Sequence, residues 1–134
     1  MAATDGRAPA RLALFAALAR APWTFDFFQA LRRIEGLFAD KPRLGRALRP
    51  GDEPVRLSQE ASVAFAPSTL SACDTNDGRP PRLEQRFFGL LGANGPLPLH
   101  ITEYARERLI HNGDPTLVRF LDLFHHRMGL LFYR

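Results

Sequence analysis

The spacing of apolar residues changes twice along this chain, and these changes constrain the fold more than any other feature. In the range 24–39, apolar side chains recur at the spacing of one helix face, at Phe27, Leu31, Ile34 and Phe38. From Val55 onward apolar and polar residues alternate, which is typical of strands with one buried face. The helical spacing returns after Pro98. The sequence therefore predicts an α+β fold in which helices cover a small sheet.

Four helices and a small antiparallel β-sheet are predicted within one domain that covers residues 9–134. The helices are expected near 11–20, 24–39, 98–111 and 115–133, with Thr24 as the cap of the second. The strands are expected within 55–66, with a turn near Gln59, and at 82–88. The remaining ranges are predicted to be a disordered N-terminus (1–8), a connector (40–54) and an exposed loop (71–81).

Charge and cysteine content argue against several classes of protein. The formal net charge is +4, and the basic residues are 17 Arg and a single Lys, Lys41. They are scattered from Arg7 to Arg134 without a dense block, which argues against a nucleic-acid-binding surface. Cys73 is the only cysteine, so an intrachain disulfide and a cysteine-based zinc site are excluded. No run of about 18 apolar residues is present, so no segment is expected to span a membrane.

A segment rich in glycine and proline joins the third strand to the third helix. Its structural residues are Gly89, Gly92, Gly95, Pro96 and Pro98. Glycines between a strand and a helix are typical of phosphate-binding loops, but this spacing matches neither the dinucleotide motif nor the P-loop. Proline also removes backbone donors that a phosphate cradle requires. We therefore interpret the segment as a structural turn whose glycines adopt positive φ and allow close packing.

A compact polar cluster lies in the last predicted helix. Asp122 and His126 are four residues apart on one helical face, so together with His100 they could bind a metal ion in a metal-dependent enzyme. No His-Glu-x-x-His motif is present, however. His125 points about 100° away from His126 and cannot join that face. The preferred interpretation is a polar lock in which Asp122 pairs with His126 or with the surroundings of Arg127.

The last predicted helix is otherwise strongly apolar. A seam with the spacing of a helix-packing face runs through Leu117, Leu121, Phe124, Met128 and Leu131. Further apolar residues widen the arc on other sides, namely Phe120, Leu123, Leu130, Phe132 and Tyr133. A small sheet and three short helices are expected to cover only one of these sides. The seam, together with Leu123, Leu130, Phe132 and Tyr133, is therefore the candidate partner interface.

Several segments occur in an order that resembles a known family. They are the helix at Phe27–Glu35, the stretches Glu53–Leu57 and Val63–Pro67, the turn region from Phe87 to Glu103, and the helix at Phe120–Arg127. Together they are similar to the N-terminal part of TssG, also called ImpH or VasB, a baseplate protein of type VI secretion systems. The similarity covers roughly residues 25–134. Because family members extend beyond the position of Arg134, the chain is expected to be a truncated N-terminal portion.

The resemblance implies a non-enzymatic scaffold of a contractile injection machine, with no cofactor. It implies a bacterial cytoplasmic location at the membrane-docked apparatus, and assembly with TssF-like, TssK-like and TssE-like proteins. It implies no nucleic acid, no small-molecule substrate and no direct membrane insertion. The alternatives make different predictions: a metal-dependent enzyme would bring His100, His126 and an acidic residue into one pocket. A basic nucleic-acid-binding module would gather the arginines on one face.

Overall fold

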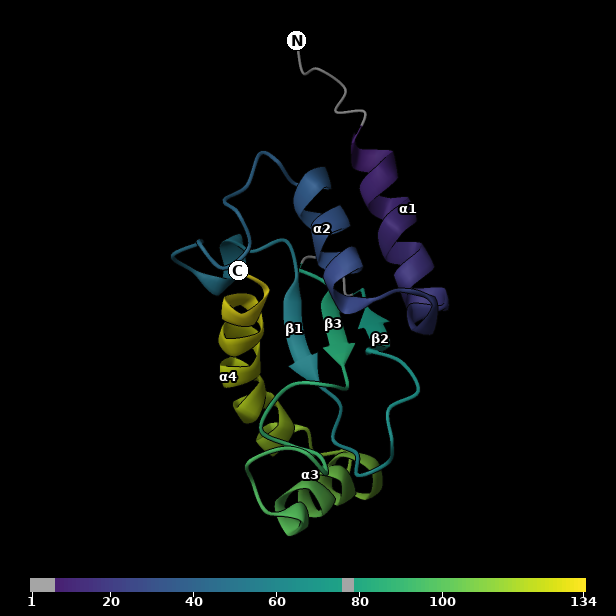
Figure 1. Ribbon diagram of the computed structural model, residues 1–134, viewed down its shortest axis with the longest axis vertical. Helices are drawn as coiled ribbons and strands as arrows, with labels where there is room; N and C mark the ends of the chain where they lie inside the picture. Colours follow the sequence, from purple (N-terminus) through teal and green to yellow (C-terminus); the bar gives the residue numbers. More distant parts are fainter. Residues whose placement is uncertain (1–6, 76–78) are drawn as a thin grey trace.

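The computed structural model describes residues 7–75 and 79–134 (Figure 1). Its elements are, in chain order, α1 (Arg7–Arg20), η1 (Pro22–Thr24), α2 (Phe27–Leu37), η2 (Pro50–Asp52), β1 (Arg56–Gln59), β2 (Leu70–Asp74), β3 (Arg82–Gln85), α3 (Leu99–His111) and α4 (Thr116–Tyr133). The predicted α+β fold, with four helices and a small sheet, is confirmed. Residues 1–6 of the segment predicted to be disordered, and residues 76–78 of the predicted loop, lie outside the described ranges.

The helices follow the predicted ranges closely, and the differences have local causes. Residues 7 and 8 of the segment predicted to be disordered belong to α1. The second helix begins later than predicted because Asp26, rather than Thr24, caps it. The Asp26 carboxylate accepts hydrogen bonds from the backbone N–H groups of Phe28 (3.1 Å) and Gln29 (3.4 Å). Thr24 instead lies at the end of the short helix η1.

The sheet is mixed, so the prediction of an antiparallel sheet is wrong. Its strand order is β1-β3-β2, with β1 parallel to β3 and β2 antiparallel to β3. The strand predicted at the end of 55–66 is also wrong, because residues 61–66 form no strand and Phe65 is 100% exposed. The second strand is Leu70–Asp74, most of which was predicted to be loop. Its apolar residues Leu70 and Cys73 are buried in the main core.

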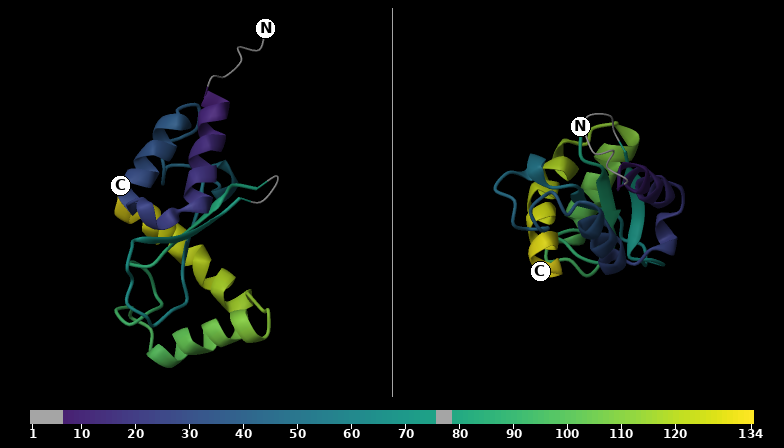
Figure 2. Two further views of the ribbon diagram at one scale, coloured as in Figure 1. Left: turned by 90° about the vertical axis from the view of Figure 1, so that its right-hand side faces the viewer. Right: turned by 90° about the horizontal axis from the view of Figure 1, so that it is seen from above.

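α4 connects the end of the molecule that holds α3 to the region of the sheet and α2. α1 and α2 lie together at one end of the sheet, and α3 lies at the opposite end of the molecule (Figures 1 and 2). α4 starts next to α3, passes beside the edge strand β1 and ends near α2. None of the helices in the described ranges is long and apolar enough to cross a membrane.

Two apolar clusters form the interior, and α4 contributes to both. The larger cluster joins α1, α2 and the sheet, and Leu130 is its fully buried residue from α4. The smaller cluster lies where α3 meets the start of α4, and it includes Ala105, Val118 and Leu121. The buried polar residues of α4 lie between these contributions in the sequence. They therefore occupy the junction between the two clusters.

Candidate assembly surface and its supporting polar network

α4 buries polar side chains beside its core residues Val118, Leu121 and Leu130, and it exposes large apolar ones. On the inner face, Asp122, His125 and His126 are only 9%, 1% and 2% exposed. On the outer face, four large apolar side chains are about half exposed or more, namely Phe120, Leu123, Phe124 and Leu131. A helix on a protein surface normally buries its apolar stripe and exposes its polar one. The inner polar groups therefore require partners, and the outer apolar groups remain largely uncovered within the described chain.

The inner face of α4 binds the open edge of the sheet. The backbone N–H of Leu57 donates to Nδ1 of His126 (3.1 Å), and the N–H of Gln59 donates to Oδ1 of Asp122 (3.3 Å). Two residues of a strand span about 6.6 Å, and four residues of a helix rise about 6 Å. The four-residue spacing of the two side chains therefore matches alternate N–H groups of β1. Gly129 allows the close approach, since a Cβ there would lie 2.9 Å from Cδ1 of Leu57.

The hydrogen bond from Leu57 fixes the tautomer of His126. A nitrogen that accepts a hydrogen bond carries no proton, so the proton of the neutral ring lies on Nε2. Nε2 is shielded from solvent and has no hydrogen-bond partner among the described residues. Burial, aided by the nearby positive charges of Arg56 and Arg127, lowers the pKa of His126 to about 4. The ring is therefore neutral at physiological pH and presents an unused donor.

Asp122 and His125 extend this network from the sheet to the turn. Nδ1 of His125 lies 3.0 Å from Oδ1 of Asp122, and Oδ2 of Asp122 accepts from Nη1 of Arg119 (2.9 Å). The predicted polar lock differs from this arrangement. Asp122 bonds His125 and Arg119, its neighbours at i+3 and i−3, while His126 binds β1 separately and Arg127 is exposed. His125, which the predicted lock does not include, contacts Asp122 at the i+3 spacing of neighbouring side chains on a helix.

Side chains occupy the backbone donors of the glycine-rich turn. Leu90 N–H donates to Nε2 of His125 (3.1 Å), Leu91 N–H to Oε1 of Gln59 (2.9 Å), and Gly92 N–H to Oγ1 of Thr102 (2.9 Å). The Gln59 side chain also donates from Nε2 to the carbonyl of Leu91 (2.7 Å). Three consecutive N–H groups are thus unavailable to a phosphate. Their arrangement joins the turn to β1, α3 and α4.

Three glycines of the turn are required either by their backbone conformation or by crowding. Gly89 has φ +147° and Gly92 has φ +93°, both in the region that favours glycine. At Gly95, whose φ is not positive, a Cβ would lie 2.5 Å from the carbonyl oxygen of Leu91. Pro96 follows in the loop, and Pro98 immediately precedes α3. These residues support the interpretation of a structural turn.

The groups proposed for chemistry do not converge. His100 is exposed at the start of α3, whereas His126 is buried against β1. Within residues 7–75 and 79–134, no group of three or more His, Cys, Asp or Glu could hold a metal ion. Cys73 is buried in β2, and burial, with a smaller effect of Asp74, raises the pKa of its thiol to about 11. Its thiolate is therefore scarce at neutral pH.

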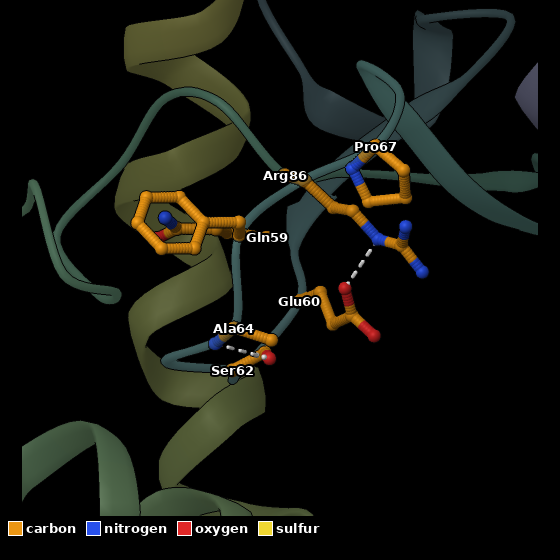
Figure 3. Close-up of a pocket in the computed structure, with 7 residues that line it drawn as sticks. Gln59, Glu60, Ser62, Ala64, Pro67 and Arg86 are labelled. Atoms are coloured by element: carbon orange, nitrogen blue, oxygen red, sulfur yellow. Dashed lines mark hydrogen bonds and ion pairs between the residues drawn. The ribbon is translucent and has the colours of Figure 1, made fainter.

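Two cavities beside this network differ in charge. One has a volume of about 230 Å³ and is lined by residues that include Glu60, Ser62 and Arg86 (Figure 3). Glu60 and Arg86 form an ion pair of 2.5 Å there, so the charges in this cavity neutralise each other. The other has a volume of about 410 Å³ and lies between β1, the start of β3 and α4. Four arginines line it, together with only one carboxylate.

The candidate interface residues of α4 separate into buried and exposed groups. Leu121 and Leu130 are 7% and 1% exposed and belong to the two cores, so they are not available to a partner. Leu117, Met128 and Tyr133 are partly buried. The exposed candidates are Leu123, Phe124, Leu131 and Phe132. Phe132 also stacks on the ring of Phe88, with ring centroids 4.9 Å apart.

These features define a small α+β domain in which a tightly hydrogen-bonded turn supports a helix with an apolar outer face. Comparison with protein families gives its identity more closely. The family model "Type VI secretion, TssG" matches residues 21–134. The chain therefore belongs to the TssG family, whose members are components of the type VI secretion baseplate. Neither the curated proteins nor the solved structures yielded a match.

Proposed function

We propose that this chain acts as a non-enzymatic structural subunit of the baseplate and docks on a TssF-like protein through the outer face of α4. Its location is then the cytoplasmic side of the membrane-docked apparatus, where TssK-like and TssE-like proteins are its further partners. Membership of the TssG family supports a baseplate role in general. The choice of α4 as the docking element rests on the geometry of its outer face.

This proposal depends on the observation that α4 buries polar side chains and exposes large apolar ones. Asp122 and His126 bind successive outward N–H groups of β1, and this fixes the rotation of the helix about its axis. With that rotation, Leu123, Phe124 and Leu131 have to point to solvent, where they are 59%, 49% and 63% exposed. Large exposed apolar patches on folded domains are typical of interaction sites. These apolar side chains of α4 are therefore left uncovered within the chain, and a partner can bury them.

A pair of double variants tests this surface. Leu123→Glu with Leu131→Glu places two charges on the outer face of α4, and we expect loss of binding to a co-expressed TssF-like protein with little change in melting temperature. Leu12→Glu with Leu48→Glu is the matched control, because these leucines are 74% and 97% exposed on other parts of the chain. The control is expected to bind as the wild type does.

The outcomes separate three possibilities. Loss of binding in the α4 variant alone supports the proposed surface. Loss of folding in that variant would assign Leu123 and Leu131 to the core, in spite of their exposure. Retention of both folding and binding would place the TssF-like contact elsewhere on the chain.

A further inference from the structure

The second cavity described above has an excess of positive charge next to the proposed docking face. We call it the arginine cavity, and its lining residues are Arg56, Leu57, Arg79, Pro80, Arg82, Arg119, Asp122, Leu123 and His126. Arg82 pairs with Asp74 (2.8 Å) and Arg119 pairs with Asp122 (2.9 Å). Arg56 forms no ion pair with any described residue. The cavity therefore keeps positive charge that no carboxylate of the described chain neutralises.

One of the residues that line the cavity also carries a buried donor without an acceptor. His126 is only 2% exposed, and its Nδ1 accepts from Leu57. Its proton therefore lies on Nε2, which has no acceptor among the described residues. A buried N–H without an acceptor is costly, and folded proteins rarely leave one. Guanidinium groups and an N–H donor together match an oxygen ligand with negative charge.

We propose that the arginine cavity receives the carboxylate of an Asp or Glu side chain from the protein that docks on α4. The inference rests on the proposed function, because it takes the outer face of α4 as the docking surface. Arg56 supplies the main charge, and Arg119 can share its guanidinium between Asp122 and the incoming group. His126 Nε2–H is a further donor; it is screened from water, so the groups that screen it have to shift before the carboxylate reaches it. Side-chain changes of this kind are common when proteins associate.

The position of the cavity favours a carboxylate that belongs to a docking protein. Leu123 forms one wall and is also part of the apolar outer face of α4. A ligand in the cavity therefore sits directly beside that face. The fitting partner is a protein surface on which an acidic residue lies next to apolar ones.

The first experiment tests the cavity on this chain alone. N-acetylglutamate α-amide, whose only carboxylate is that of its side chain, is titrated into the ¹⁵N-labelled chain at concentrations around the millimolar range, and the ring nitrogens of His126 are followed by NMR. N-acetylglutamine α-amide, which has no carboxylate, is the control. We expect the Nε2 resonance to shift more with the former than with the latter, and the difference to shrink in Arg56→Gln. An equal response to both compounds, or no response to either, overturns the inference. This comparison needs only the wild type, so it stands even if Arg56→Gln fails to fold.

The second experiment uses the docking partner. Arg56→Glu is expected to weaken binding of the TssF-like protein about tenfold or more, while Arg49→Glu, an equal charge change on an exposed residue before η2, leaves it near wild type. A single Asp or Glu to Lys substitution in the partner should restore binding to Arg56→Glu. Equal weakening by both variants would indicate general charge attraction and overturn the inference.

The two proposals fail in different ways. If Arg56→Glu binds as the wild type does while Leu123→Glu with Leu131→Glu does not, the docking surface stands and the carboxylate contact is overturned. If the leucine variant binds normally and only Arg56→Glu does not, the proposed role of the α4 face is overturned. The cavity then remains as a contact in its own right.

Discussion

Substituting Gly89 by alanine should destabilise the domain strongly, because this position combines an unusual backbone with a crowded site. Its φ of +147° is one that residues with a side chain rarely adopt. An alanine Cβ would also lie 2.2 Å from Oε1 and 2.6 Å from Cδ of Gln59, and 2.9 Å from Cδ2 of His125. Both of these side chains hold the turn, so neither can move without breaking hydrogen bonds.

The size of the effect follows from these contacts. Backbone strain of this kind costs about 1–3 kcal/mol. Displacing the Gln59 amide breaks its two hydrogen bonds with Leu91, which contribute about 1 kcal/mol each. The expected loss for Gly89→Ala is therefore about 3–5 kcal/mol of the free energy of unfolding. That is a large fraction of the roughly 5–15 kcal/mol that stabilises a typical domain.

Chemical denaturation of Gly89→Ala and Gly36→Ala measures this difference directly. Gly36 lies exposed in α2, and an alanine Cβ there would meet no atom within 4 Å, so alanine should stabilise the helix by up to about 1 kcal/mol. The same substitution, glycine to alanine, is thus expected to lower the free energy of unfolding at Gly89 and to raise it at Gly36. A Gly89→Ala protein within about 0.5 kcal/mol of the wild type would refute the assigned role of the turn.

Two further predictions concern α4. Leu130→Ala should lower the free energy of unfolding by about 2–5 kcal/mol because Leu130 is 1% exposed. Leu131→Ala should change it by less than about 0.5 kcal/mol because Leu131 is 63% exposed. Thermal or chemical denaturation of both variants measures the difference, and similar losses would contradict the inner and outer faces assigned to α4. The pKa of His126 falls from 6.5 to about 4 on folding, so the unfolded chain takes up a proton on this residue at a higher pH than the folded chain does. The free energy of unfolding should therefore decrease by about 3 kcal/mol as pH falls from about 6.5 to about 4. Burial raises the pKa of Glu53, which has the opposite effect on stability, so the quantity to measure is the difference between the pH profiles of the wild type and His126→Gln; parallel profiles would contradict the lowered pKa of His126.

The sequence was sufficient for the helices because their signals are local. Apolar spacing and helix-breaking residues placed all four helices near their observed ranges. The strands depend on contacts that the local pattern does not contain. The alternation at Val63 and Phe65 looks like a strand, yet both side chains are exposed and no described strand pairs with that segment. Leu70–Asp74 contains small and polar residues typical of a loop, and it becomes a strand only by pairing with β3.

The same contrast applies to the candidate site. The sequence predicts glycines with positive φ in the turn, and two of them, Gly89 and Gly92, have positive φ in the structure. The role of Asp122 could not, because its partners include a backbone N–H of Gln59, 63 residues away in the sequence. Leu121 of the helical seam and Leu130 of the wider apolar arc were candidates for the partner interface, but both are buried within the chain. Spacing identifies the residues that share a face, but only the packing decides which face turns inward.

The hydrogen bonds between α4 and β1 also determine how this domain can associate. β1 is an edge strand. The N–H groups of Arg56 and Glu60 donate to carbonyls of Pro81 and Gln85, on the side of β3. The N–H groups of Leu57 and Gln59 face the other way and donate to side chains of α4. An exposed edge invites β-augmentation, in which a strand from another chain joins the sheet and copies can aggregate. Here helix side chains take the place of that strand. This edge of the sheet is therefore closed to growth by strand addition, and association along it is left to side chains whose chemistry can select the partner.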